Sequence, residues 1–553
     1  MTAVAIPIGQ PQFDDERHLS RLALSLSASP ARHHSLLATS PRPSSIAAVH
    51  NDDADDKPAP AYEDNMSRSI KYTAVIDGST KPIRAVQQVD TLPQVHTGTI
   101  TDNFKTALQD IDLEECEAHG DNAFFVCDLA EVYRQHVRWM RELGHRVQPF
   151  FGEWPQLTRG DRKPALVNTI PCPMSTAVKS NPDPYVLRLM SALGLGFDCA
   201  SQPEISAVLA LPHRPEPSRI IYANPCKAAS FVRNAAKNGV NYMTFDNGDE
   251  LVKIKKYHPN AKMVLRILTD DSSSLCRLGL KFGAPLSEVR GLLRKAASLG
   301  VNVVGISFHC GSGCKDPSLF GDAIRRARWA FDVGAEEGFN FDLLDIGGGF
   351  EDGNFEAIAA VLREAIDQSF PLDAQGRGVR VIAEPGRYYV SRAFQLATNI
   401  IARRAARDGI NDETSMMDGV DDEQADDDSK PTAMYYINDG VYGAFNCTMF
   451  DHQIVHPVVM TLNETFYNSA DVDHGLLEEC SVWGPTCDSI DVVQPQAKLP
   501  VSVLNVGDWL RWENMGAYTI CAASQFNGFR KSLVRYTIDA DEVVEGKIRA
   551  LLA

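Results

Sequence analysis

Three apolar runs in the middle of the chain decide the fold: VVGISFH (303–309), LLDIGGGF (343–350) and VRVIAEPG (379–386). Each run is short and apolar and ends in a polar residue or a turn, which is typical of a buried parallel strand. Five similar runs precede them: VQPFF (147–151), GFDCA (196–200), IIYANP (220–225), MTFD (243–246) and MVLRI (263–267). The eight runs together predict the strands of one sheet.

Segments with helical periodicity separate most of these runs. The clearest are DPYVLRLMSALGL (183–195), KAASFVRNAAKNG (227–239), LSEVRGLLRKAASLG (286–300) and NFEAIAAVLREAIDQSF (354–370). Strands that alternate with helices form parallel βα units. Eight such units over about 240 residues match the count and size of a (β/α)8 barrel. We therefore predict an α/β fold built on a TIM barrel.

Polar or glycine residues stand at, or just past, the C-terminal ends of the runs. They are Lys179, Asp198, Asn224, Asp246, Arg266, His309, Gly347 and Glu384. In a barrel these ends meet at one mouth, where active sites are built. Strands that merely end at a surface would explain two or three of these residues, but not the lysine, histidine, glycines and glutamate together. We therefore predict a site at this mouth.

Short strands and turns replace this pattern after residue 390. MYYINDGVYGAF, HPVVMTL, CSVWGP, NVGDWLRW, AYTICAA and SLVRYTI are broken by Gly, Asn and Asp, which predicts an antiparallel β domain of the sandwich or Greek-key kind. We assign it to 394–553 and the barrel to 129–393, and expect 66–128 to add strands to the β domain. Residues 1–65 and 408–431 are too polar to pack, so we expect a disordered extension and an acidic loop.

Composition limits the classes of function. The 553 residues include 72 acidic and 54 basic side chains, and the net charge of −18 argues against a nucleic-acid surface. No apolar run approaches the ~18 residues of a membrane span, and no secretory signal is recognised at the N-terminus. The twelve cysteines lack metal-binding spacing and are interpreted as free thiols. We expect a cytoplasmic protein without metal, nucleic acid or membrane.

The residue types at the predicted mouth suit pyridoxal 5′-phosphate. The Lys179 amine would form an imine with the cofactor aldehyde, and Gly347, Gly348 and Gly349 would let backbone N–H groups approach its phosphate. Glu384 would keep the pyridine nitrogen protonated, because the ring cation is the electron sink for a carbanion. A glycine triplet or a lone histidine is more often structural, so only the combination supports this prediction.

Nine motifs, in order, resemble the eukaryotic ornithine decarboxylases. They are AVKSNPDP, GFDCAS, YANPCK, FHCGSGC, LLDIGGGF, AEPGRYYV, NDGVYGAFNC, WGPTCDSID and ENMGAYT. This family of pyridoxal-phosphate-dependent enzymes has an alanine-racemase-like barrel and a C-terminal β domain. The resemblance covers about 120–151 and 177–530. It implies an enzyme that converts L-ornithine to putrescine, the entry to polyamine biosynthesis.

The resemblance also implies the cofactor residues. Lys179 would carry the imine, Glu384 would face the pyridine nitrogen and His309 would stack on the ring. The phosphate would be held by Ser312, Gly347, Gly348, Gly349, Gly386, Arg387 and Tyr518. Asp198, Glu204 and Arg277 match family residues that order the lysine and the ring. The family has a cysteine where this chain has Ser180, and we expect little effect.

The terminal ammonium group of ornithine is costly to desolvate unless it meets carboxylates. The resemblance implies Asp451 and Asp488 for this contact, each worth roughly 1.5–3 kcal/mol, and places Phe450, where the family has tyrosine, and Phe526 in the pocket. Cys487 matches the family residue that protonates the α-carbon, although an inert thiol is its alternative. In the family, Cys487 and Asp488 reach the other subunit's site, which implies an obligate homodimer.

Two other functions stay open. One is decarboxylation of lysine or another diamino acid, since one methylene changes discrimination only ~10–200-fold. The other is a non-catalytic paralogue that binds antizyme, the family's protein inhibitor. Segment 236–266 resembles the surface that antizyme binds, but a solvated basic helix face at Lys253, Lys255 and Lys256 is an equal interpretation.

Residues 152–176 interrupt the resemblance. The segment GEWPQLTRGDRKPALVNTIPCPMST stands between Phe151 and Ala177, which the family joins directly, and its four prolines exclude a central strand. We interpret it as a retained intron, because its ends can be encoded with an in-frame splice donor and acceptor. If the mature protein keeps the segment, residues 175–179 alone should supply the strand before the lysine.

Overall fold

The structure is a computed structural model that describes residues 94–147 (without 112, 114–117 and 119), 175–405, 433–467 and 477–553. The predicted extension at 1–65, residues 152–174 of the inserted segment and the predicted acidic loop at 408–431 lie outside the described residues.

Eight parallel strands form one sheet in the order β12-β11-β9-β7-β6-β5-β4-β3. Their bounds are β3 Ser175–Ala177, β4 Gly196–Cys199, β5 Ile220–Tyr222, β6 Tyr242–Phe245, β7 Lys262–Arg266, β9 Asn302–Ser307, β11 Leu343–Asp345 and β12 Arg380–Ile382. The two ends of this order come together, because a Cβ on Gly386, just past β12, would lie 3.2 Å from Cβ of Ala177 in β3. The sheet is therefore the wall of the predicted barrel.

The first strand differs from the run that was predicted for it. Most of VQPFF (147–151) lies outside the described residues, and β3 takes the first place in the sheet. Its three residues pair with β4, with Ala177 opposite Asp198. This short strand directly before Lys179 is the one expected of a chain that keeps the inserted segment.

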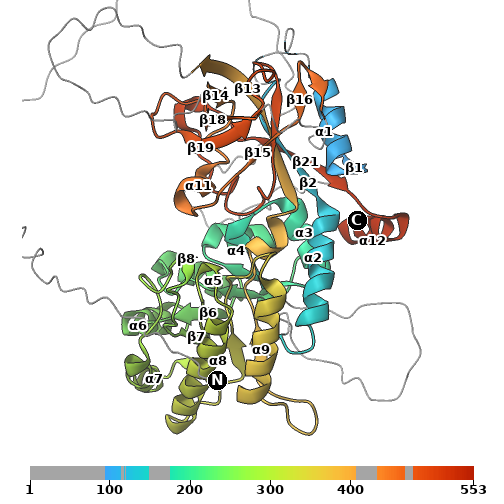
Figure 1. Cartoon of the computed structure of the whole chain (residues 1–553). Helices are drawn as coiled ribbons and strands as arrows, with labels where there is room; N and C mark the ends of the chain where they lie inside the picture. Colours follow the sequence, from blue (N-terminus) through green and yellow to red (C-terminus); the bar gives the residue numbers. More distant parts are fainter. Residues whose placement is uncertain are drawn as a thin grey trace, which may run out of the picture. The chain divides into compact units, whose positions relative to one another are not determined.

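Helices connect the strands and contact their neighbours around the barrel. They are α3 Pro184–Ala192, α4 Gln202–Leu209, α5 Ala229–Lys237, α6 Gly248–Tyr257, α7 Leu286–Leu299, α8 Ser318–Glu336 and α9 Phe355–Ser369 (Figure 1). Helix α7 illustrates the cause: Val289, Leu292, Leu293 and Ala296 are buried at helical spacing. The helix ends where Gly300 adopts φ 61°. All four helices singled out in the sequence are confirmed.

A second sheet has the order β1-β21-β2-β13-β14-β18-β19, with β20 joining β13 to β15 (Figure 1). The bounds are β1 Val95–Thr97, β2 Phe124–Asp128, β13 Phe394–Ala405, β14 Ala433–Ile437, β15 Pro457–Val459, β18 Glu478–Trp483, β19 Val492–Leu499, β20 Trp509–Trp512 and β21 Leu533–Ile538. N-terminal strands thus join C-terminal ones, as predicted. The predicted fold class is confirmed, although the sheet is mixed, because β21 runs parallel to β1 and β2, and β14 parallel to β18.

One predicted strand, AYTICAA (517–523), is wrong. The segment forms turns, with Tyr518 at φ 56°. Its polar groups bind the turn that carries Lys179: the N–H of Tyr518 donates to the carbonyl of Ser180 at 2.9 Å, and Nδ2 of Asn181 donates to the carbonyl of Gly516 at 2.8 Å. These contacts with the barrel replace the strand pairing that local alternation predicted.

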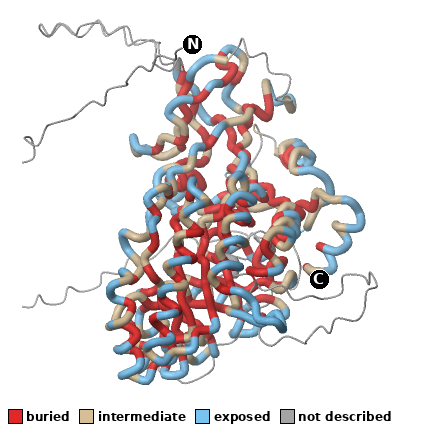
Figure 2. The backbone as a smooth tube through the Cα atoms, turned by 60° about the horizontal axis from the view of Figure 1, so that its bottom comes forward, coloured by how far each residue is buried: buried red, intermediate tan, exposed pale blue. Residues whose placement is uncertain are grey.

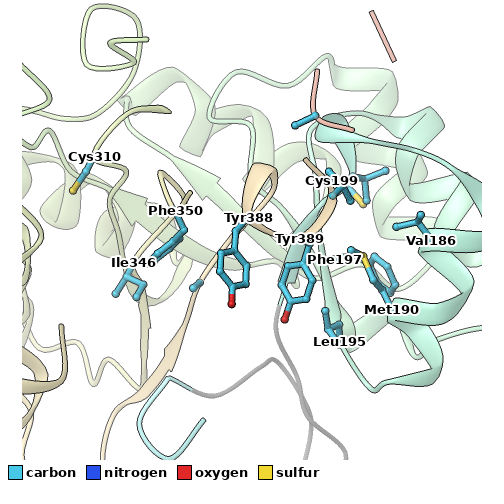
Figure 3. Close-up of a cluster of buried hydrophobic side chains, with 14 of the residues drawn as sticks. Val186, Met190, Leu195, Phe197, Cys199, Cys310, Ile346, Phe350, Tyr388 and Tyr389 are labelled. Carbon is cyan, nitrogen blue, oxygen red and sulfur yellow. The ribbon is translucent and has the colours of Figure 1, made fainter. Parts of the chain in front are cut away.

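Buried side chains connect the strand ends to the rest of the core. Figure 2 shows buried backbone running through the barrel, with exposed residues on its outer side. Trp139 of α2 (Leu129–Glu142) packs on Phe350, Phe355 and Tyr388, and Figure 3 shows Phe350 and Tyr388 in one buried cluster with Tyr389. The described helices include none with the length and apolar character needed to cross a bilayer.

Candidate active site

Lys179 lies in a 3-10 turn, Val178–Ser180, directly after β3. Its Nζ donates to Oδ2 of Asp198, a fully buried residue of β4, at 2.6 Å. Burial lowers the pKa of the amine, but the negative charge of Asp198 outweighs burial and raises the pKa above its ordinary value. Lys179 is therefore an ammonium group held in place by a buried carboxylate.

A pair of carboxyl groups lies in the same pocket. Asp345 ends β11 and hydrogen-bonds with Glu384, which follows β12. Burial raises the pKa of Asp345 to about 6. Burial, together with the charges of Asp198 and Asp345, raises the pKa of Glu384 well above its ordinary value. Glu384 is therefore the protonated partner that donates to Asp345, and the Arg266 charge lies close enough to stabilise the ionised groups.

The three glycines after β11 form a close-fitting turn. A Cβ on Gly347 would lie 2.2 Å from the carbonyl oxygen of Phe308, and one on Gly349 would lie 2.5 Å from that of Gly311. Both residues have positive φ, at 64° and 100°, so only glycine fits here. A Cβ on Gly348 would lie 2.8 Å from Nε2 of His309. The turn therefore lies directly against the histidine.

His309 is neutral in this setting. The N–H of Gly311 donates to its Nδ1 at 3.0 Å, which leaves the ring proton on Nε2. Burial, reinforced by the positive charges of Arg266 and Lys179, lowers the pKa of the imidazole well below its ordinary value. A neutral ring can present its face to a flat ligand without adding charge.

Arg387 opens α10 (Arg387–Val390), and its side chain is 8% exposed. Two buried tyrosines follow it and anchor the helix; the hydroxyl of Tyr388 donates to the carbonyl of Gln135 at 3.0 Å. The Arg387 guanidinium lies 5.3 Å from the centre of the Tyr518 ring. It forms ion pairs with Glu351, from Nε to Oε1 at 3.3 Å, and with Asp451.

Two further residues of the predicted phosphate site, Gly386 and Ser312, lie on other segments than the glycine turn. Gly386 is buried, and a Cβ there would lie 3.0 Å from Cβ of Ser180. Ser312 begins β10 (Ser312–Cys314), opposite Cys276 of β8 (Ser274–Cys276).

These residues fit pyridoxal phosphate. Oδ1 of Asp198 is buried without a hydrogen-bond partner, although Oδ2 binds the lysine. The glycine turn leaves no room for side chains where a phosphate needs backbone N–H groups, and Arg387 supplies a buried positive charge. Glu384 can face a ring nitrogen. When bound, the cofactor supplies the electron sink for a carbanion.

Two of the predicted ordering residues differ in their surroundings. Oε2 of Glu204 accepts from the N–H of Ala200 at 2.7 Å, which fixes the turn two residues past Asp198. Arg277 instead pairs with Asp271, from Nε to Oδ1 at 3.5 Å, and its side chain is 50% exposed. Arg266, rather than Arg277, faces the buried carboxyl groups.

The predicted substrate residues fall into two groups. Asp451 follows α11 (Asn446–Phe450) and contacts Arg387 and the thiol of Cys276, whose Sγ donates to Oδ1 at 3.3 Å. Asp488, in contrast, accepts from the hydroxyl of Tyr442 at 2.5 Å and from the N–H of Ile490, both in the β domain.

Around Asp488 the surface is open. Cys487 is exposed and unpaired by disulfide. Phe526 stacks on Tyr442 with ring centres 4.2 Å apart, yet 42% of it is exposed, and Phe450 is 73% exposed. We refer to Phe450, Cys487, Asp488 and Phe526 as the rim, and to Lys179, Asp198, His309, Asp345 and Glu384 as the mouth.

Sequence reasoning missed some functional contacts. Asp345 was overlooked although it stands at the strand end in LLDIGGGF, which is the signal that identified its neighbours. Arg266 was placed at the mouth without a role. No local sequence pattern marks Tyr442 or Cys276. Each contributes through a hydrogen bond to a carboxylate far away in the sequence, Tyr442 to Asp488 and Cys276 to Asp451.

Known proteins resemble this chain in sequence and in fold. A family described as pyridoxal-dependent decarboxylase, pyridoxal binding domain, matches residues 165–391. The ornithine decarboxylase of Schizosaccharomyces pombe is 46% identical over 87% of this chain and 98% of its own length. Antizyme inhibitor 2 of Xenopus laevis is 44% identical over 78% of this chain and 84% of its own.

Among solved structures, the arginine decarboxylase of Paramecium bursaria Chlorella virus bound to agmatine matches with a TM-score of 0.63 and 31% identity. The match covers 79% of this chain and all of that one. The chain therefore belongs to the family of pyridoxal-phosphate-dependent decarboxylases that includes the ornithine decarboxylases.

Proposed function

We propose that this protein decarboxylates L-ornithine to putrescine and CO2, the first step of polyamine biosynthesis. The observation that carries the proposal is the Lys179 ammonium, bound at 2.6 Å to buried Asp198 and surrounded by Glu384, His309 and the glycine turn. A decarboxylase needs each of these groups, whereas a binding protein needs none of them. Identity of 46% with an ornithine decarboxylase supports ornithine as the substrate.

The residues of the site have distinct proposed tasks. Lys179 would hold the cofactor through its aldehyde, and Asp198 holds the amine in position. Glu384 would keep a proton at the ring nitrogen, and the glycine turn, Arg387 and Tyr518 would hold the phosphate. Cys487 would supply a proton to the α-carbon, while Asp451 and Asp488 would bind the terminal ammonium of the substrate.

We infer that the active form is a homodimer in which the rim of one subunit completes the mouth of the other. The rim includes two exposed aromatic side chains, Phe450 at 73% and Phe526 at 42%, and an exposed thiol, Cys487. Large apolar side chains gathered beside catalytic groups are typical of an interface that another chain covers.

Mixing two inactive variants tests the shared site. Lys179→Ala and Cys487→Ala are expected to be inactive alone, but random exchange of subunits should restore about a quarter of the sites, because half of the symmetric dimers are mixed and each holds one intact site. No recovery after refolding the two together would contradict a shared site.

We also place the protein in the cytoplasm, because all ten cysteines of the described residues are free thiols. Antizyme stays a proposed partner on the strength of the likeness to an antizyme inhibitor. Helix α6, within the segment predicted to bind it, has Lys253 paired with Glu250, and Nζ of Lys255 donates to the carbonyl of Gly300.

The function is tested by measuring CO2 release from labelled ornithine and labelled lysine by the purified full-length protein with pyridoxal phosphate. We expect release from ornithine to exceed that from lysine by about 10–200-fold in kcat/KM, the range that one methylene provides. A preference for lysine would favour the alternative substrate. Cofactor binding without release from either amino acid would favour the non-catalytic, antizyme-binding alternative.

A further inference from the structure

Asp451 contacts a residue that its proposed role does not predict. Its carboxylate forms an ion pair with Arg387, and the thiol of Cys276 donates to Oδ1 at 3.3 Å. Arg387 is a proposed ligand of the cofactor phosphate, whereas Asp451 is a proposed ligand of the substrate ammonium. One side chain therefore connects the two ligand sites.

A phosphate bound to Arg387 would be the third anion at this side chain. The guanidinium is 8% exposed and already meets two carboxylates, Glu351 at 3.3 Å and Asp451. A phosphate on Arg387 would add negative charge to a group whose own charge is already balanced. Like charges repel strongly where water is excluded, so the phosphate must displace one of the two carboxylates.

Asp451 is the carboxylate that we expect the phosphate to displace. It is the residue that ends α11, a helix of only five residues, and His452 after it adopts φ 53°. Its side chain is 12% exposed, against 32% for Glu351. Water therefore screens Asp451 less, and a phosphate on Arg387 repels it more strongly than it repels Glu351. A substrate ammonium offers it a replacement for the lost guanidinium.

We propose that Asp451 is an interlock between cofactor and substrate: it pairs with Arg387 until a phosphate takes that arginine, and the phosphate thereby releases Asp451 to bind the terminal ammonium of the diamino substrate. The inference rests on the proposed function. Because such coupling is reciprocal, a diamine that binds Asp451 must also strengthen the binding of phosphate. The interlock favours substrate binding only where cofactor is already present.

The test uses the full-length protein, dialysed free of pyridoxal phosphate, with inorganic phosphate and 1,4-diaminobutane as probes in titration calorimetry. In the unaltered chain, saturating phosphate should tighten diamine binding about tenfold, within the usual range of coupling between sites. Asp451→Asn should tighten phosphate binding by about the same factor and abolish the coupling.

Glu351→Gln is the matched control, since it removes the other carboxylate charge that pairs with the Arg387 guanidinium. It should tighten phosphate binding but keep the coupling, because Glu351 has no proposed contact with the diamine. Equal coupling in Asp451→Asn and the unaltered chain would overturn the interlock, as would phosphate affinity unchanged by Asp451→Asn. If that variant does not fold, coupling in the unaltered chain still decides, and its absence overturns the proposal.

The outcome separates the interlock from the proposed function. Coupling that is present in a protein that releases no CO2 from ornithine would support the interlock and contradict the decarboxylase. Decarboxylation without coupling would support the enzyme and overturn the interlock.

Discussion

The mouth and the rim carry groups proposed to act on the same substrate, yet they differ in burial. Asp198, Asp345 and Glu384 are 0%, 1% and 8% exposed, and each has a partner within the chain. Phe450 and Phe526 of the rim are 73% and 42% exposed. A buried charge must be balanced by partners within the fold that buries it. The side chains of an exposed rim are solvated and need no such partner. The fold of a single chain therefore balances the buried charges of the mouth, whereas the side chains of the rim stay exposed on it.

The largest effect is expected at the mouth. Lys179→Ala should lower kcat by about 10⁴-fold or more, as removal of a covalent catalytic group typically does. It should also abolish the visible absorption band that depends on the bond between the lysine amine and the cofactor aldehyde. Lys295→Ala, which removes an exposed lysine of α7, is the control for lysine loss. Retention of a tenth of the activity by Lys179→Ala would disprove the assignment.

Removal of the inserted segment tests how firmly strand β3 holds Lys179 in the mouth. Deleting 152–176 would place Phe150 and Phe151 at the register positions of Ser175 and Thr176, opposite Gly196 and Phe197. A longer strand before Lys179 should hold the amine more firmly, and misplacement of about 1 Å can cost ~10²-fold in rate, so we expect activity to rise by up to that factor. CO2 release by both forms measures it.

The splicing hypothesis has its own check. Sequencing the mature transcript should show residues 151 and 177 encoded next to each other. Continuous coding through 152–176, or a deletion variant less active than the full chain, would contradict the interpretation as an intron.

The rim should show a smaller effect that depends on substrate charge. Asp488→Asn removes a charge-assisted contact worth roughly 1.5–3 kcal/mol, which lowers kcat/KM for ornithine by about 10–150-fold. Steady-state kinetics on ornithine and on 2-aminopentanoate, which lacks the terminal ammonium, measure this difference. Tyr442→Phe, which removes only the hydroxyl that donates to Asp488, should change the rate much less. An equal loss of kcat/KM on both substrates would show that Asp488 does not bind the terminal ammonium group.

The smallest effect is expected in the pH dependence of stability. Burial raises the pKa of Asp345 from 3.8 to about 6, so the folded protein binds this proton more tightly than the unfolded chain does. The stabilisation is complete below about pH 4 and is lost as the pH rises through about 6, an effect on the order of 1–3 kcal/mol.

Urea unfolding between pH 4 and 7 measures it. The difference in unfolding free energy between the unaltered chain and Asp345→Asn should fall with rising pH. Asp198 and Arg266 face this group in both proteins, and Glu384 shares a hydrogen bond with it, so the difference reports on the pair Asp345 and Glu384. A flat difference would show that Asp345 is not protonated on folding.

The local pattern of the chain determined seven of the eight barrel strands, the four clearest helices and the polar residues at the strand ends. Burial imposes a period of two or 3.6 residues on each element, and parallel strands point their C-terminal ends the same way. Lys179, Asp198, His309 and Glu384 could therefore be grouped before any coordinates, and the cofactor chemistry follows from their types.

Only the tertiary structure decided which distant residues meet. The segment at 517–523 alternates like a strand, yet it turns against the lysine turn, where the N–H of Tyr518 and the thiol of Cys521 donate to the carbonyl of Ser180. The pairing of Asp345 with Glu384 and of Arg387 with Asp451 joins residues 39 and 64 positions apart. Such contacts depend on how whole elements pack, and no local period encodes them.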